Sequence, residues 1–190
     1  MELHSKNRFK KTAITDIAIN KVQRVKYKGL TDEQNEMLYR FAKLVLLKAQ
    51  QENNSNESTI TIDLDNLDGR IGEINGSEHI IDVDADPNSY HLLRTGDNVA
   101  IIHNHPSTQT LSMEDVYFFL HFDTLRYTIV VSNQGTIHYL MKDKNFDLRQ
   151  TIVLCQECTE DLTDSSPAKE YYAASLDFLT HCSEVGLYYG

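Results

Sequence analysis

The sequence predicts an α/β domain of the α+β class, in which a mixed, mostly antiparallel sheet is flanked by helices. Apolar residues recur at helical spacing from Met37 to Val45, and strand-like runs follow at 59–64 and 99–102. A second helical pattern and a hairpin come next, and elements in this order are typical of such domains. The chain of 190 residues is 41% hydrophobic, which is enough for one domain with a sizeable core.

Composition divides the chain into three parts: a basic arm (1–28), a main domain (29–142) and a helical C-terminal extension (143–190). Two short runs in the arm, 13–19 and 22–27, have the composition of β-strands. We expect the arm to be a solvated or sheet-flanking segment rather than a nucleic-acid site. Its basic residues are Lys6, Arg8, Lys10, Lys11, Lys21, Arg24, Lys26 and Lys28.

The first helix has a clear start. Gly29 interrupts the chain, and Thr31 stands at the position of an N-cap. Gln34 can reach back to Thr31 in a capping box, and Leu30 can pack on the first turn. The helix should run to about Gln51, where an Asn-rich stretch ends it.

A strand and a hairpin follow this helix. Residues 59–64 alternate polar and apolar side chains, so their apolar members share a core face. The Asn75-Gly76 pair favours a hairpin turn between strands 70–74 and 77–83. Residues 84–88 are expected to form an acidic loop.

The second half of the main domain is predicted to contain a strand, a helix and a hairpin. Residues 99–102 are continuously apolar and predict a buried strand, and residues 113–124 predict a helix. A hairpin is expected between 127–131 and 136–141.

The C-terminal extension has two helical patterns joined by a polar connector at 157–166. The first covers 147–154, and the second covers 168–185 and ends at Gly186. The second helix is expected to bury Tyr172, Leu176 and Leu179.

Charge and composition exclude several classes. The net charge of -10 and the pI near 5.2 argue against nucleic-acid binding, which needs clustered Lys and Arg. No apolar run approaches the ~20 residues of a membrane span, and the N-terminus lacks the apolar stretch of a signal peptide. Three Cys do not make a disulfide framework, so a reducing, cytoplasmic setting is expected.

A metal-binding pattern follows the buried strand. Side chains two apart on a strand point the same way, so His103 and His105 should project together from its end. Pro106 cannot continue the ladder and ends the strand. Ser112 has the position of an N-cap, and Asp115 then falls in the first turn of the next helix.

Two imidazoles and one carboxylate suit zinc, and three protein ligands leave a fourth position open for water. A lone His on a strand is usually a partly buried polar group, and a Ser with an acid three residues later is often only a cap. The conjunction of both patterns is much rarer, so the sequence predicts a metal site.

The same residues resemble a known family. His-x-His-Pro followed by Ser-x-x-Asp resembles the motif of the JAMM/MPN+ (JAB) zinc metalloproteases. The tetrapeptide His103-Asn104-His105-Pro106 is most similar to that of bacterial and phage RadC-like members. The resemblance runs from about residue 30 to 140. In the common form of the family seven residues separate the second His from the Ser, whereas here there are six, 106–111.

The resemblance implies a JAB/MPN-like fold and a Zn²⁺ ion held by His103, His105 and Asp115. It implies that a Glu at the start of the strand after the first helix is the general base, and the matching residue is Glu57. It also implies that Ser112 donates a hydrogen bond to the oxyanion that develops on the substrate.

Several assignments stay open. Glu73 and Glu78, on either side of the Asn75-Gly76 turn, are alternatives to Glu57, although a solvated hairpin face explains them as well. Cys155 and Cys158 form a Cys-x-x-Cys that could join His181 and Cys182 in a second zinc site, but no second Cys-x-x-Cys supports it. The remaining His residues, expected to be structural or exposed, are His79, His91, His121, His138 and His181.

We therefore expect a cytoplasmic zinc-dependent peptidase or isopeptidase that acts on a peptide or protein, with a ubiquitin-like modifier as one candidate. A non-catalytic MPN-like binding module is a second possibility, and a RadC-like role in DNA metabolism is a third. Neither nucleic acid nor a membrane is an expected partner. The sequence does not define the oligomeric state.

Overall fold

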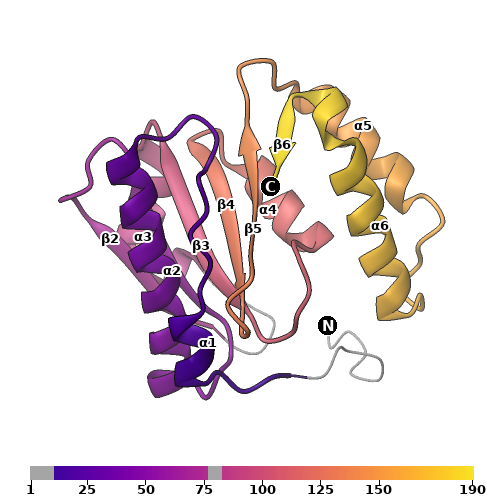
Figure 1. Cartoon of the computed structure of the whole chain (residues 1–190). Helices are drawn as coiled ribbons and strands as arrows, with labels where there is room; N and C mark the ends of the chain where they lie inside the picture. The colour runs from indigo at the N-terminus through magenta and orange to yellow at the C-terminus, as the bar shows by residue number, and fades with distance from the viewer. Residues whose placement is uncertain (1–10, 77–82) are drawn as a thin grey trace.

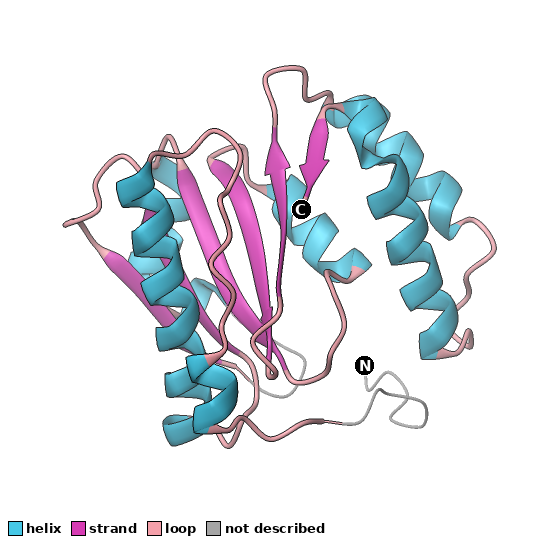
Figure 2. Ribbon diagram, in the orientation of Figure 1, coloured by secondary structure: helices cyan, strands magenta, loops and turns pink. Residues whose placement is uncertain are grey.

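The computed structural model describes residues 11–76 and 83–190, which form six α-helices and a six-stranded sheet (Figure 2). The strand order is β2-β1-β3-β4-β5-β6; β3 and β4 are parallel and all other neighbours are antiparallel. The predicted α+β class is therefore confirmed. The strands are β1 Ser58–Asp63, β2 Ile71–Asn75, β3 Val99–His105, β4 Leu125–Ser132, β5 Ile137–Lys142 and β6 Leu187–Tyr189. The helices are α1 Asp16–Asn20, α2 Asp32–Glu52, α3 Pro87–Thr95, α4 Met113–His121, α5 Leu148–Thr159 and α6 Ala168–His181.

Helices lie on both faces of the sheet (Figure 1), and the sheet separates two apolar cores. On β3, Ala100 and Ile102 face α2, whereas Val99 and Ile101 face the opposite core, to which α3, α4, α5 and α6 contribute. Both faces of β3 are buried, which explains the continuously apolar run 99–102 in its first half. The parity of a residue on β3, that is, whether its number is odd or even, therefore decides which core it faces.

Helix α2 begins as predicted. The Thr31 hydroxyl accepts the Gln34 N–H at 3.2 Å, and the Gln34 side chain accepts the Thr31 N–H at 2.9 Å. The helix ends at Glu52, with Asn53 as its C-cap, and Asn54 and Ser55 then adopt positive φ angles of 50° and 58°. This turn directs the chain into β1.

The two strands predicted in the basic arm are wrong. Residues 16–20 form α1 instead, because the Thr15 hydroxyl accepts the Ala18 N–H and caps a helical turn. Residues 22–27 form no strand ladder. Their bonds to the β4–β5 hairpin are isolated, as when the Gln23 N–H donates to the Gly135 carbonyl and the Gln23 side chain accepts the Ile137 N–H.

The region after β1 differs in two respects. The first strand of the predicted hairpin, 70–74, corresponds to β2, but β2 pairs with β1. The second strand of that hairpin lies largely in 77–82, outside the described residues. The predicted acidic loop instead contains a 3₁₀ turn, Val83–Ala85, and the start of α3. Asp86 caps α3 by accepting the Ser89 N–H at 2.7 Å, and Pro87 occupies its first turn.

The C-terminal helices are confirmed, with changes at their ends. Helix α5 continues to Thr159, and a 3₁₀ turn, Cys182–Val185, follows α6 before Gly186 ends it at φ 78°. Leu179 is buried as predicted, but Leu176 is 41% exposed, because α6 turns Ala174, Ser175 and Phe178 towards the core instead. Strand β6 was not predicted. No helix within 11–76 and 83–190 is long and apolar enough to cross a membrane.

Candidate metal centre

The end of β3 carries the two imidazoles. His103 and His105 have the parity of Ile101, so both face the core on the α4 side, where they are only 6% and 8% exposed. The Asn133 N–H donates a hydrogen bond to the His105 carbonyl, and this bond holds the end of the strand. The structure thus places the His pair as the alternation predicted.

The parallel pairing of β3 and β4 explains how Asp115 reaches them. The connection between parallel strands must cross back over the sheet, so α4 begins beside the end of β3 where the imidazoles lie. Ser112 caps α4: its hydroxyl accepts the Asp115 N–H at 3.1 Å and donates to Asp115 Oδ2 at 2.8 Å. The Ser112 N–H also donates to Oδ2, at 2.6 Å, so the cap fixes the carboxylate.

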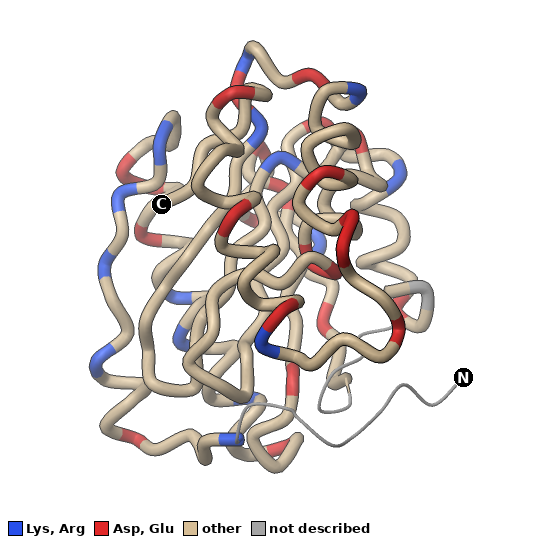
Figure 3. Tube along the Cα trace, turned by 90° about the vertical axis from the view of Figure 1, so that its right-hand side faces the viewer, with Lys and Arg blue, Asp and Glu red and all other residues tan. Residues whose placement is uncertain are grey.

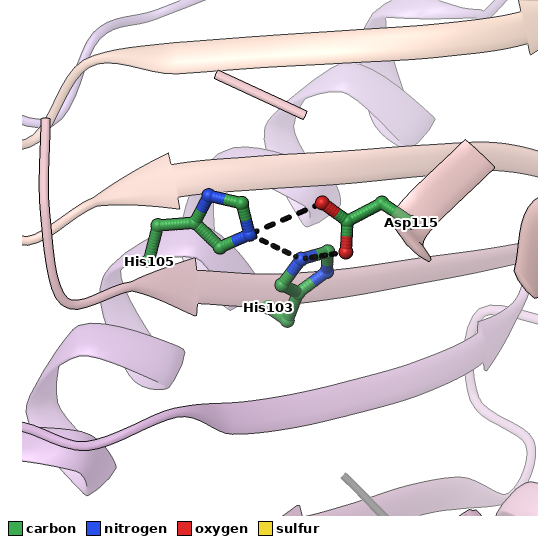
Figure 4. A group of neighbouring side chains, drawn as sticks. All are labelled: His103, His105 and Asp115. Atoms are coloured by element: carbon green, nitrogen blue, oxygen red, sulfur yellow. Dashed lines mark hydrogen bonds and ion pairs between the residues drawn. The ribbon is translucent and has the colours of Figure 1, made fainter. Parts of the chain in front are cut away.

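The three side chains converge on one point (Figure 4). His103 Nε2 lies 3.1 Å from His105 Nε2, and these atoms lie 3.0 Å from Asp115 Oδ1 and 3.2 Å from Oδ2, respectively. Zinc bonds of about 2.0–2.1 Å in a tetrahedral site place neighbouring ligand atoms about 3.3 Å apart. The measured distances involve both carboxylate oxygens, and each is close to this ligand–ligand spacing, so the three side chains are near enough to share one metal ion.

The electrostatics also suit a cation. Burial alone would raise the pKa of Asp115, but the facing imidazoles of His103 and His105 hold it well below its usual value. Burial alone would lower the pKa of His105, but the charge of Asp115, followed by that of Glu57 and a hydrogen bond to the main chain of Gln109, raises it. The carboxylates thus favour positive charge at a place where a metal ion could replace imidazole protons.

Glu57 lies next to this cluster. In the antiparallel register Thr59 opposes His103, so two residues earlier Glu57 comes level with His105 on the same face of the sheet. Its charge is one of those that raise the His105 pKa. The structure thus brings together Glu57 and the three predicted ligands.

The alternative Glu73 is on the wrong face. It opposes Ile60, which belongs to the α2-side core, and its carboxylate lies 2.9 Å from Lys48 Nζ of α2. Glu78 lies outside the described residues.

Two further groups at this end of the sheet were not predicted. Asn104 stands between His103 and His105 in the sequence, but its fully buried side chain faces the α2 side. On the face of the sheet that carries His103 and His105, Tyr189 Oη lies 2.9 Å from both His138 Nδ1 and Thr110 Oγ1. Burial, and to a smaller extent the charge of the nearby His105, lowers the pKa of His138. The sequence contains no local pattern for these contacts, which join distant segments.

The Cys-x-x-Cys does not form a second cluster. Cys155, Cys158 and Cys182 are free thiols, and burial raises their pKa values to about 12, 11 and 11. Among the described residues, only His103, His105 and Asp115 form a group able to hold a metal.

Comparison with known proteins gives no relative, since no protein-family model, curated protein or solved structure matches the chain.

Proposed function

We propose that the chain is a zinc-dependent peptidase or isopeptidase of the JAMM type, with Zn²⁺ held by His103, His105 and Asp115. The observation that carries the proposal is the convergence of two Nε2 atoms and a carboxylate at separations of 3.0–3.2 Å. Zinc bound there supplies a water of lowered pKa and polarises the scissile carbonyl.

The residues around the cluster have separate tasks in this reaction. Glu57, on the His105 side, accepts the proton of the attacking water and returns it to the leaving amine. Ser112, at the N-terminus of α4, donates to the developing oxyanion, for which its hydroxyl must turn from Asp115 Oδ2. The helix N-terminus favours negative charge at the same place.

The substrate class is a peptide or protein, with a ubiquitin-like modifier as one candidate. Acidic residues outnumber basic ones in the C-terminal helices and their connector (Figure 3), and this negative charge disfavours a nucleic-acid substrate. The free thiols suit a reducing compartment, and we propose the cytoplasm.

Two measurements test the proposal. Elemental analysis should find one zinc per chain, lost in both His103→Ala and Asp115→Ala; unchanged zinc in both variants would refute the site. A peptide-library screen with and without chelator should then find cleavage that chelation abolishes.

Glu57→Gln should keep zinc and lose cleavage by a factor on the order of 10²–10⁴, the usual worth of a positioned acid–base group. Glu73→Gln is the matched control and should remain active. If the zinc-loaded protein cleaves nothing, the peptidase reading fails and a non-catalytic binding module replaces it. A DNA affinity that falls steeply with salt would instead favour a role in DNA metabolism.

A further inference from the structure

Asn104, between His103 and His105 in the sequence of β3, carries a buried amide. Its side chain faces the α2 core and has no solvent exposure. A buried amide that lacked partners would be costly, so its hydrogen bonds indicate why this face holds a polar residue.

Those bonds are made on either side of Glu57. Asn104 Oδ1 accepts the Ser58 N–H at 2.7 Å, and Asn104 Nδ2 donates to the Asn56 carbonyl at 3.0 Å. One planar amide therefore holds the main chain both before and after Glu57.

The contacts continue the sheet where its ladder stops. The last registered pair between β1 and β3 is Thr59 with His103, so the Asn104 contacts lie just beyond the end of this ladder. The Glu57 carbonyl accepts the Gly76 N–H at 2.9 Å and Asn53 Nδ2 at 2.7 Å. Together these bonds hold the Glu57 main chain between β3 and the end of β2.

Asn133 completes the arrangement. Its Oδ1 accepts a second bond from Asn104 Nδ2 at 2.8 Å, which fixes the amide's orientation. Its own Nδ2 donates to the carbonyls of Thr12 and Ser55, and its N–H donates to the His105 carbonyl. The same network therefore holds both the Glu57 segment and the strand end that carries His105.

We propose that Asn104 is a positioning residue that places the Glu57 carboxylate against the metal-binding cluster. This role rests on the proposed function, since it matters most if Glu57 is the general base. Asn104 touches neither metal nor substrate and acts through the main chain of residues 56–58. Because a displacement of about 1 Å at a reacting group can cost on the order of 10²-fold in rate, such a support has a measurable effect.

The first test uses zinc-loaded protein and the peptide cleaved best in the library screen. Asn104→Asp keeps the acceptor for the Ser58 N–H but loses both donated bonds. It should keep one zinc per chain and a KM within a few-fold, while kcat falls on the order of 10²-fold. Ser175→Ala, a buried polar change on α6 away from this network, is the control and should leave kcat unchanged.

A double-mutant cycle separates positioning from general destabilisation. In a Glu57→Gln background, Asn104→Asp should cause little additional loss of kcat, because the group it positions is already absent. Multiplicative losses, or an unchanged kcat in zinc-loaded Asn104→Asp, would overturn the proposal.

Amide hydrogen exchange gives a readout that needs no activity. Asn104→Ala should speed exchange of the Ser58 N–H while leaving that of Ile129, in the centre of β4, unchanged. If Asn104→Ala does not fold, Asn133→Ser removes one partner of the same amide and should act in the same direction. Unchanged Ser58 exchange in the folded variant would refute the support itself, whereas absence of cleavage by unmutated protein would refute only the proposed function.

Discussion

Lys142 lies at the end of β5, and the loss of its buried proton should make the protein more stable as the pH rises above 8. Its side chain is buried, its Nζ donates to the Phe122 carbonyl at 2.6 Å, and it lies 4.7 Å from the ring centre of Phe119. Burial lowers the pKa of Lys142 from 10.5 to about 8, against a smaller opposing effect of the Asp123 charge. The folded state therefore loses this proton at a lower pH than the unfolded state does.

The direction and size of this pH dependence follow from the linkage between proton binding and folding. Between about pH 8 and 10.5 the unfolded chain holds the Lys142 proton and the folded chain does not, so the free energy of unfolding rises with pH. The pKa shift corresponds to a gain of about 3 kcal/mol in the free energy of unfolding at full effect. Solvent screening at the strand end should reduce this gain to about 2 kcal/mol.

Denaturant titrations at pH 7, 8, 9 and 10 would measure this effect. Lys142→Met should be more stable than the unmutated protein at pH 7, by about 2 kcal/mol, and the difference should shrink towards pH 10. The Phe122 carbonyl keeps a partner in the variant, since the Leu125 N–H also donates to it. Exposed Lys144, replaced by Met, is the control. A Lys142→Met difference that stays constant with pH would refute the reasoning.

Three other predictions concern caps, turns and thiols. Ser112→Ala removes the cap of α4 and should lower the free energy of unfolding of metal-free protein by about 1 kcal/mol; an unchanged denaturation midpoint would contradict the capping role. Gly186→Ala should cost more than about 1 kcal/mol, because φ is positive and the new Cβ would lie 2.3 Å from a main-chain carbon. Gly29→Ala, at a similar φ but with its nearest atom 3.5 Å away, should cost less by the same titration, and equal costs would exclude the close contact as the cause. A Cys155→Ser, Cys158→Ser double variant should keep its zinc by elemental analysis; a folded variant without zinc would show that the thiols take part.

The elements that could be predicted are those whose chemistry is local. The capping box of Thr31 and Gln34 lies within four residues, and the metal-binding pattern lies within 103–115. Strand alternation puts the two imidazoles on one face and the N-cap orients Asp115, and both effects depend on neighbouring residues alone. That Asp115 meets the imidazoles also requires the parallel pairing of β3 with β4.

The elements that could not be predicted depend on distant partners. Tyr189 reaches Thr110 and His138 only because β6 pairs with β5, and nothing near Tyr189 in sequence specifies that pairing. The role of Asn104 likewise depends on the register between β1 and β3. Helix α3 is the exception, since Asp86 followed by Pro87 is a recognisable helix start that the acidic composition concealed.

The capping box of α4 has a consequence for how this protein could diversify. Asp115 is oriented by Ser112 and its own helix, so the loop 106–111 does not set the geometry of the ligand. Its ends are anchored, at Pro106 by the Thr12 N–H and at Leu111 by full burial. Between them, Ser107 and Gln109 bond each other, and it is the main chain of Gln109 that bonds the His105 side chain. Evolution, or a designer, could therefore change the side chains of residues 107–109 beside the metal centre while leaving the ligand set intact.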